Sequence, residues 1–397
     1  MQLIDLDREQ RIVPLFRLAF RAFFLFGAAF SMVALILWGK VWFGGLAFTP
    51  YGNWLWWHGH EMLFGFVGAI ITGFLLTAVQ NWTGRMGLRG VPLMGLFLVW
   101  LLGRVMLLFP APFPELLIAV IDVSFLPLVA GVLGFYVVTA KLWRNLLFVP
   151  VLLILALLNA FMHLAALEND LLLYKKLAAS VVFLIAFLVS LMGGRVIPFF
   201  TANATDTEKA TPLKWLEIAC LLSILLLALG TLIGLNELTL GAVSLFACCV
   251  HLVRTWRWRS WITLKIPLLW SLHLACWFMV LGFLQLALFY WGIIADYVTV
   301  LHTLTVGGIG LIILGMIARI SLGHSGRSLT ISPWMAVAFV ALVFATLLRA
   351  ILPMLLNELS IAISYGGSIA LWVAGFSIFV LCYYPILTKP RLDGRPG

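Results

Sequence analysis

Charged side chains are scarce in this sequence of 397 residues. Asp, Glu, Lys and Arg make up only 10% of it, whereas hydrophobic residues make up 64%. Soluble domains contain about 25% charged and about 45–50% apolar residues, so the composition excludes a soluble globular fold. It predicts an integral membrane protein, and no stretch of the chain is polar enough to form a separate soluble domain.

Apolar runs long enough to cross a bilayer follow one another along the whole chain. A membrane-spanning helix needs about 20 apolar residues, because the hydrocarbon core is about 30 Å thick and holds no water to satisfy backbone groups. Twelve such runs are bounded by charges, proline or glycine, at residues 17–38, 58–80, 91–109, 116–139, 146–167, 175–197, 214–234, 238–256, 267–290, 298–319, 333–352 and 361–384. The sequence therefore predicts an all-α membrane protein with twelve transmembrane helices in a single domain, 1–397, with short tails at 1–16 and 385–397.

Acidic residues number only 15, against 25 basic ones, and the basic residues are distributed unevenly. If consecutive loops lie on alternate sides of the membrane, 20 Lys and Arg side chains, including Arg8 and Arg395, fall on the side that holds both termini. The positive-inside rule therefore predicts that both termini are cytoplasmic. The net charge of +10 follows from this topology. Nucleic acid is not expected as a partner, because the basic residues do not gather on one exposed module.

Cysteine is rare, and its placement excludes two kinds of site. The five cysteines all fall within predicted spans, at Cys220, Cys248, Cys249, Cys276 and Cys382. A disulfide framework is therefore not expected. The sequence also lacks a C-x-x-C-H motif, so any haem would be held non-covalently.

An internal repeat relates two of the predicted spans. A shift of 242 positions aligns the second span with the tenth and places His60 on His302. The same shift aligns Gly65, Gly68 and Gly73 with Gly307, Gly310 and Gly315, and Thr83-Gly84-Arg85 with Ser325-Gly326-Arg327. Glycines on a helix face let a neighbouring helix, or a flat macrocycle, come close. The sixth span ends in Gly193-Gly194-Arg195, and this spacing of four spans is compatible with a pseudo-threefold arrangement like that of haem-copper oxidase main subunits.

Four of the seven histidines are predicted to lie at one depth, near the periplasmic ends of their spans. His58, His60 and His302 begin inward-running spans, and His163 lies close to the periplasmic end of the fifth. Neutral imidazole is a common ligand of haem iron and copper, and ionisable groups within a span are functional candidates. We predict metal ligation by these four and by His273, which lies toward the cytoplasm.

The alternative for each histidine is a polar group satisfied by water or a carbonyl oxygen, and this alternative is preferred for His251 and His324. Residues two apart on an α-helix point about 200° away from each other. His58 and His60 are therefore expected to serve different centres on opposite sides of the second span. Glu61 is a catalytic candidate, as an acceptor for a ligating imidazole or as a proton carrier, and otherwise an interfacial carboxylate.

Three further charged residues lie within spans. Arg104 and Arg349 each lie a few residues before the periplasmic end of the span that follows a histidine-bearing one. Arginines at this depth are suited to clamp haem propionates, and snorkelling to the headgroups is an equal alternative. Asp122, inside the fourth span, is predicted to relay protons or to pair with an arginine.

Three long segments carry a resemblance to a known family. They are WHGHEMLFGFVGAIITGFLLTAVQNWTG, GGRVIPFFTANA and LHTLTVGGIGLIILGMIARISLGHSGR, at 57–84, 193–204 and 301–327. In their order and in the twelve-span layout they resemble the signature segments of the NnrS family. The resemblance implies a haem- and copper-containing protein of the bacterial inner membrane, associated with nitric oxide metabolism and protection against nitrosative stress.

The favoured hypothesis is a redox enzyme that reduces nitric oxide. One or two b-type haems, or a haem with a nearby copper, would lie between spans two and ten, and nitric oxide would enter from the lipid bilayer. The electron donor would be a quinol or a separate cytochrome. Two alternatives are a twelve-helix secondary transporter, in which internal repeats also occur, and a nitric oxide sensor or carrier without turnover.

Overall fold

The structure is a computed structural model that describes residues 11–45, 48–356 and 360–393. These ranges consist of helices joined by turns and loops, and they contain no strand. The all-α prediction is therefore confirmed. Arg8 and Arg395 lie outside the described residues, as do the outermost parts of both predicted tails.

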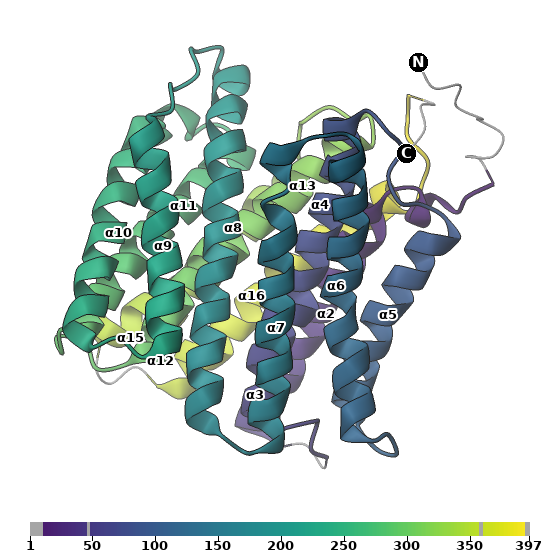
Figure 1. The fold of residues 1–397 in the computed structure, drawn as a ribbon. Helices are drawn as coiled ribbons and strands as arrows, with labels where there is room; N and C mark the ends of the chain where they lie inside the picture. Colours follow the sequence, from purple (N-terminus) through teal and green to yellow (C-terminus); the bar gives the residue numbers. More distant parts are fainter. Residues whose placement is uncertain (1–10, 46–47, 357–359, 394–397) are drawn as a thin grey trace. The chain divides into compact units, whose positions relative to one another are not determined.

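Twelve helices within the described ranges are long and apolar enough to cross a membrane. They are α2 (Ala19–Phe43), α3–η2–α4 (Trp54–Thr83), α5 (Val91–Leu108), α6 (Glu115–Thr139), η3–α7 (Trp143–Leu167), α8 (Leu171–Thr205), α9 (Lys214–Ile233), α10 (Glu237–Arg257), α11 (Pro267–Tyr290), α12–η5–α13 (Tyr297–His324), α14–η6–α15 (Pro333–Leu355) and η7–α16 (Ala362–Leu387) (Figure 1). The predicted number of spans is confirmed. The chain is a multi-pass membrane protein.

The helix limits differ from the predicted spans in two informative places. The second helix begins at Trp54, four residues earlier than predicted, because the side chain of Asn53 accepts a hydrogen bond from the Trp56 N–H at 2.9 Å and caps the helix. Helix α8 continues through Pro198 to Thr205. Membrane helices tolerate an internal proline because neighbouring groups satisfy the freed carbonyl.

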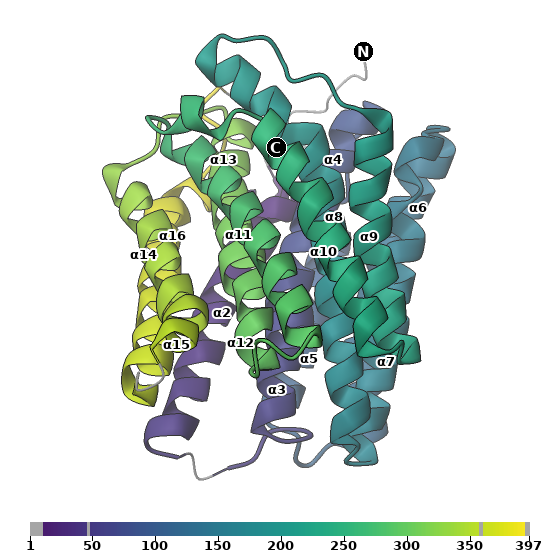
Figure 2. The same ribbon diagram turned by 90° about the vertical axis from the view of Figure 1, so that its left-hand side faces the viewer.

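The chain folds into two compact units that interleave in sequence. Unit 1 consists of Met1–Lys175, Arg319–Thr330 and Phe379–Gly397, and unit 2 of Lys176–Ala318 and Ile331–Ile378. Within unit 1, α6 packs against both α5 and α7 (Figure 1). Within unit 2, α11 lies beside α10 (Figure 2).

The repeat seen in the sequence is also a repeat of backbone conformation. α3 ends at His60 and is followed by a π-helical segment, η2 (Glu61–Val67). α12 ends at His302 and is followed by a second π-helical segment, η5 (Thr303–Gly310). π-Helical segments are rare and are frequently found at functional sites. The same shift of 242 residues therefore relates both the histidines and the change of helix type behind them.

The repeated glycines mark equivalent close contacts in the two units. A Cβ atom on Gly65 would lie 2.6 Å from the ring of Phe30 and 2.9 Å from Nη1 of Arg104. A Cβ atom on Gly307 would lie 2.7 Å from both Phe278 and Thr346. Arg104 and Thr346 are themselves separated by 242 residues. The repeat therefore extends to the spans that follow, α5 and α14.

Candidate metal centre

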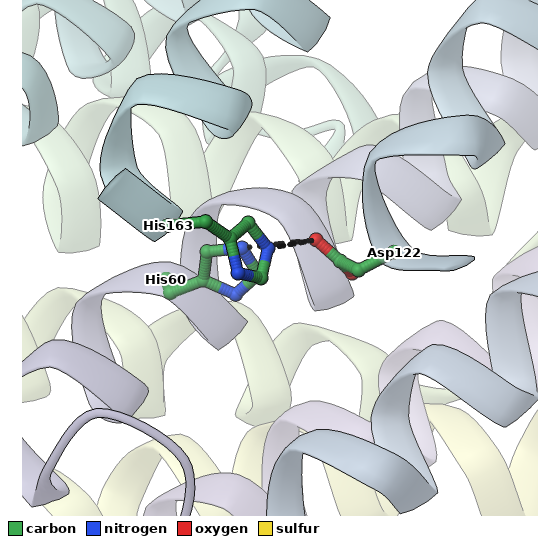
Figure 3. Close-up of side chains that lie close together, drawn as sticks. All are labelled: His60, Asp122 and His163. Carbon is green, nitrogen blue, oxygen red and sulfur yellow. Dashed lines mark hydrogen bonds and ion pairs between the residues drawn. The ribbon is translucent and has the colours of Figure 1, made fainter. Parts of the chain in front are cut away.

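Three side chains from three helices of unit 1 meet at one buried point (Figure 3). His60 is the last residue of α3, Asp122 lies in α6 and His163 lies near the end of α7. Oδ2 of Asp122 is 3.2 Å from Nε2 of His60 and 3.1 Å from Nε2 of His163. The three potential ligand atoms all lie within 4.8 Å of one another.

This arrangement fits one small metal ion. Metal–ligand bonds of about 2.0–2.2 Å place two ligands about 3.0–3.5 Å apart at octahedral or tetrahedral angles, and the distances of 3.1 and 3.2 Å from Asp122 fall in that range. A metal ion here would be bound by the lone pair on Nε2 of His60 and would take the place of the contact between Nε2 and Oδ1 of Asn159. Three protein ligands leave coordination positions open for a small molecule, as in catalytic rather than structural sites.

A second layer of polar groups orients the three potential ligands. Nδ1 of His60 donates to Oε1 of Glu61 at 2.9 Å, which directs Nε2 toward Asp122. Oδ1 of Asn159 lies 2.7 Å from Nε2 of His60. Nδ2 of Asn159 donates to Oδ2 of Asp122 at 2.7 Å. Carboxylate and carbonyl partners of this kind fix the ring orientation of metal-bound histidines.

Arg104 balances the negative charge of the site. Its guanidinium is only 4% exposed and forms ion pairs with both Glu61 and Asp122. The sequence offered a haem propionate and the headgroups as equal alternatives for Arg104, and the structure pairs it with two protein carboxylates. One of them is Asp122, for which an arginine partner was predicted. Two carboxylates buried at the same depth in the membrane need a nearby cation. This explains why the arginine side chain points into the helix bundle rather than toward the lipid headgroups.

Gly65 makes this ion pair sterically accessible. It lies one turn after Glu61 in the π-helical segment, and a Cβ atom there would lie 2.9 Å from Nη1 of Arg104 and 3.1 Å from Oε2 of Glu61. The backbone carbonyl of Gly65 also accepts a hydrogen bond from the indole of Trp100 at 2.9 Å, which ties η2 to α5. The glycine of the repeat therefore positions charged groups as well as packing helices.

Aromatic rings cover the site on the side predicted to face the periplasm. Trp56 stacks on His60 with ring centroids 4.4 Å apart and packs edge-on against His163 at 5.3 Å. Tyr51, in the loop before α3, lies 5.2 Å from the His163 ring. Burial, with a further contribution from Glu115, raises the pKa of Tyr51 to about 12. The phenol therefore stays protonated near neutral pH.

Several polar atoms at this site are buried and have no hydrogen-bond partner among the described residues. They are Oε2 of Glu61, Nδ1 of His163 and the hydroxyl of Tyr51. Buried polar groups are normally satisfied by protein or by ordered water. Their presence around three metal-ligand candidates supports a site that also takes a small polar or metal-bound ligand.

A haem does not fit at His60 in this arrangement. Both ring nitrogens face protein oxygens, with Glu61 on one side and Asn159 on the other. The ring faces are covered by Trp56 at 4.4 Å and Phe64 at 5.1 Å. A macrocycle bound through Nε2 would have to displace all of these groups, whereas a single ion would replace only the contact between Nε2 and Asn159.

His58 lies on the other side of the second helix. Its ring stacks on Trp38 of α2, with centroids 4.6 Å apart and planes 5° from parallel. Helical spacing predicts that His58 and His60 face opposite ways, and their contacts agree with this. His58 is not part of the three-residue group. Between the two histidines, Gly59 leaves room for the hydroxyl of Tyr174, which donates to the carbonyl of Leu55 at 3.2 Å.

His302 and Arg349 lie in unit 2. Nδ1 of His302 donates to the carbonyl of Val298 at 2.7 Å, which places the ring's lone pair on Nε2. Arg349 lies over the ring of Tyr365 at 4.1 Å and donates to Oγ1 of Thr299 at 3.3 Å. The tautomer of His302 is the one that a metal ligand needs.

His273 and His251 have contacts that explain them without a metal. Both nitrogens of His273 are within hydrogen-bond distance of hydroxyls, Thr201 at 2.8 Å and Ser260 at 3.0 Å. His251 donates to the carbonyl of Cys220 at 3.2 Å and accepts from Arg254 at 3.2 Å. The preference for a satisfied polar group at His251 agrees with these contacts, while the metal prediction for His273 gains no support.

A sequence model of one family, described as NnrS protein, matches residues 14–391. The chain belongs to the NnrS family. The match covers nearly the whole chain, including every residue of the three-residue group and of the charge network around it. A search of curated proteins finds no match. Membership in the NnrS family fits a role in nitric oxide metabolism and an association with metal cofactors.

Sequence reasoning missed three residues of this site. Asn159 lies four residues before His163, on the same face of α7, and an amide in an otherwise apolar span was a readable signal. Trp56 and Tyr51 gave no signal, because aromatic residues are common near both membrane interfaces.

Proposed function

We propose that this NnrS-family protein binds nitric oxide at a metal ion held by His60, Asp122 and His163, and reduces it. The observation that carries the proposal is the buried group of two imidazoles and one carboxylate, fewer ligands than a structural metal site has. Nitric oxide is small and apolar, so a buried site within a membrane helix bundle is accessible to it from the bilayer. Family membership in nitric oxide metabolism supports this substrate.

The proposed reaction is the two-electron reduction 2 NO + 2 H⁺ + 2 e⁻ → N₂O + H₂O. A quinol of the bilayer supplies both electrons and both protons and becomes a quinone, with a separate cytochrome as the alternative donor. The metal supplies a Lewis-acidic, redox-active binding position for nitric oxide. The side chains of the chain hold that position, exclude water and place a carboxylate, Glu61, beside it.

Glu61 is the residue best placed to move a proton to the site. Its Oε1 atom is held by His60 and Arg104, while its Oε2 atom is buried without a hydrogen-bond partner among the described residues. A carboxylate that is held through one oxygen while its other oxygen has no hydrogen-bond partner is suited to pass a proton and keep its position. Asp122, in contrast, is engaged through both oxygens, which suits a ligand better than a proton carrier.

The haem that the family resemblance implies is assigned in this proposal to His302. The support is local: its Nδ1–H donates to a backbone carbonyl, as histidine ligands of haem and other metals commonly do. Arg349 donates a hydrogen bond to Thr299, which lies one helical turn before His302. Arg349 is therefore kept as the proposed partner of a haem propionate. The inner membrane of a bacterium is the proposed location.

The proposal is tested with the purified full-length protein, its metal and haem content and its nitric oxide turnover. With a chemical reductant present, sustained loss of nitric oxide with appearance of N₂O is expected, and Asp122→Asn should abolish it. His273→Gln is the matched control, because it alters a buried histidine of unit 2 that two hydroxyls already satisfy. One stoichiometric binding event without N₂O would point to a sensor or carrier, and absence of any metal or haem would favour transport.

A further inference from the structure

The donor atoms at the centre of unit 1 limit which metal suits it. They are two imidazole nitrogens and one carboxylate oxygen. No cysteine belongs to the group in the described part of the chain, and the five cysteines lie elsewhere. Thiolate and thioether ligands select copper(I), zinc and iron–sulfur clusters; imidazole suits zinc, copper, iron and nickel, and a carboxylate suits harder ions.

The proposed reaction adds a second restriction, and the inference rests on that proposed function. A metal that passes electrons to nitric oxide must be stable at this site in its reduced state. Reduced copper is copper(I), a soft ion for which a carboxylate is a poor ligand. Reduced non-haem iron is iron(II), and two histidines with one carboxylate, leaving open positions, form its characteristic site.

We propose that His60, His163 and Asp122 bind a non-haem iron(II) ion, to which nitric oxide coordinates directly. The short distances from Asp122 to both imidazoles bring together the three donor atoms that would hold the ion. The remaining positions are available to nitric oxide. This assignment differs from the copper that the family resemblance implies.

The surroundings of the three donors are consistent with an iron site that is built rather than incidental. His60 is oriented by Glu61 and Asp122 by Arg104 and Asn159, so two of the three donors have an outer partner. His163 is held between Trp56 and Tyr51. Outer partners of this kind contribute about 10–100-fold to metal affinity.

The experiment compares three ions on the same protein. Full-length protein is stripped with a chelator, reduced without oxygen and incubated separately with iron(II), copper(I) or zinc(II), and the metal retained per chain is measured after desalting. We expect one iron(II) per chain, retained better than copper(I). Retention of copper(I) in preference to iron(II) would overturn the proposal, while zinc(II), which binds nitrogen and oxygen ligands more tightly than iron(II) in general, serves as the redox-inert control for occupancy of the site.

Nitric oxide is then added to the iron-loaded protein, and its electron paramagnetic resonance spectrum is recorded. A non-haem iron(II)–nitric oxide adduct has spin 3/2, whereas a haem–nitric oxide adduct has spin 1/2, so haem elsewhere in the chain does not interfere. The spin-3/2 signal should be lost in Asp122→Asn, which keeps the size of the side chain, and kept in His273→Gln. A spin-3/2 signal that persists in Asp122→Asn would contradict the assignment.

Turnover separates failure of this inference from failure of the proposed function. Iron binding with a spin-3/2 adduct but no N₂O would leave the iron site standing and refute the reductase function. N₂O formation by copper-loaded protein, with no iron retained, would refute the iron site and leave the reductase function standing.

Discussion

The second and third spans of unit 1 and the tenth and eleventh spans of unit 2 share a backbone design but differ in chemistry. In both, a histidine ends a short helix, a π-helical segment follows, and a glycine of that segment meets a side chain of the next span. In unit 1 the residue after the histidine is Glu61, and the side chain that packs against the glycine, Gly65, is that of Arg104. In unit 2 the equivalent positions hold Thr303 and Thr346.

The comparison separates what the repeated backbone provides from what the charged residues provide. The backbone places a histidine at the start of a widened helix and leaves space beside a glycine. The metal-ligand group of unit 1 additionally needs Asp122 from α6 and His163 from α7, with Glu61 and Arg104 to orient and neutralise them. One design therefore supports two different histidine environments in one chain.

The largest effect is expected for the removal of a ligand. Asp122→Asn should lower the affinity for the bound metal by at least about 100-fold, beyond the effect of losing an outer-layer partner, and abolish nitric oxide turnover. The check is metal content after dialysis, together with activity. Unchanged haem content would show that the loss is confined to unit 1, whereas full retention of metal would break the comparison.

The second expected effect is on stability. Arg104→Gln leaves two buried carboxylates without their cation, and breaking such a buried pair costs about 3–5 kcal/mol. The thermal unfolding temperature should fall clearly in detergent. The control Arg349→Gln, an arginine of the corresponding span in unit 2, loses a hydroxyl contact and a cation–π contact, worth about 2 kcal/mol or less.

The double substitution Arg104→Gln with Glu61→Gln sharpens this prediction. It removes one negative charge together with the positive one, so unfolding should occur at a higher temperature than in Arg104→Gln alone. If the double variant is less stable than the single one, charge balance is not what Arg104 contributes.

A smaller effect is expected when the outer partner of His60 is changed. Glu61→Gln keeps the size of the side chain but weakens the acceptor of the His60 Nδ1–H, which should lower metal affinity about 10–100-fold. Thr303→Val, at the equivalent position of unit 2, should leave that affinity unchanged. Titration of chelator-stripped protein with iron(II) measures both, and equal effects would contradict the difference between the two units.

The smallest effect is expected from the glycines that the two units share. Gly65→Ala and Gly307→Ala both place a methyl group within 2.7 Å of a neighbouring side chain, and overpacking of this kind costs about 1–3 kcal/mol. Both should lower the unfolding temperature by similar amounts. Only Gly65→Ala should also weaken metal binding, because its methyl group pushes against Arg104.

Most of the fold was predictable because it depends on composition and on the thickness of the hydrocarbon core of the membrane. Twelve apolar runs, charge asymmetry and the alignment of His60 with His302 are visible without coordinates. The change to π-helix after each histidine was not predictable, because η2 and η5 share glycines that also occur in regular membrane helices. The start of the second helix was misjudged because the cap, Asn53, precedes the apolar run.

The three potential ligands were predictable as functional candidates, but their contacts and the surrounding Asn159, Trp56 and Tyr51 were not. Depth along each helix placed His60 and His163 in one layer, and helical spacing separated His58 from His60. A hydropathy pattern does not show which helices are neighbours. The contact of Asp122 with both histidines could therefore be found only from the structure. Arg104 was assigned to a haem propionate because its carboxylate partners lie on other spans.

The most direct test of the central claim is the content of tightly bound non-haem metal per chain in wild type, His163→Gln and His302→Gln. The account predicts one ion per chain in the wild type, its loss in His163→Gln and its retention in His302→Gln, because the three-residue group lies wholly within unit 1. Retention of the ion in His163→Gln, or its loss in His302→Gln alone, would contradict the account.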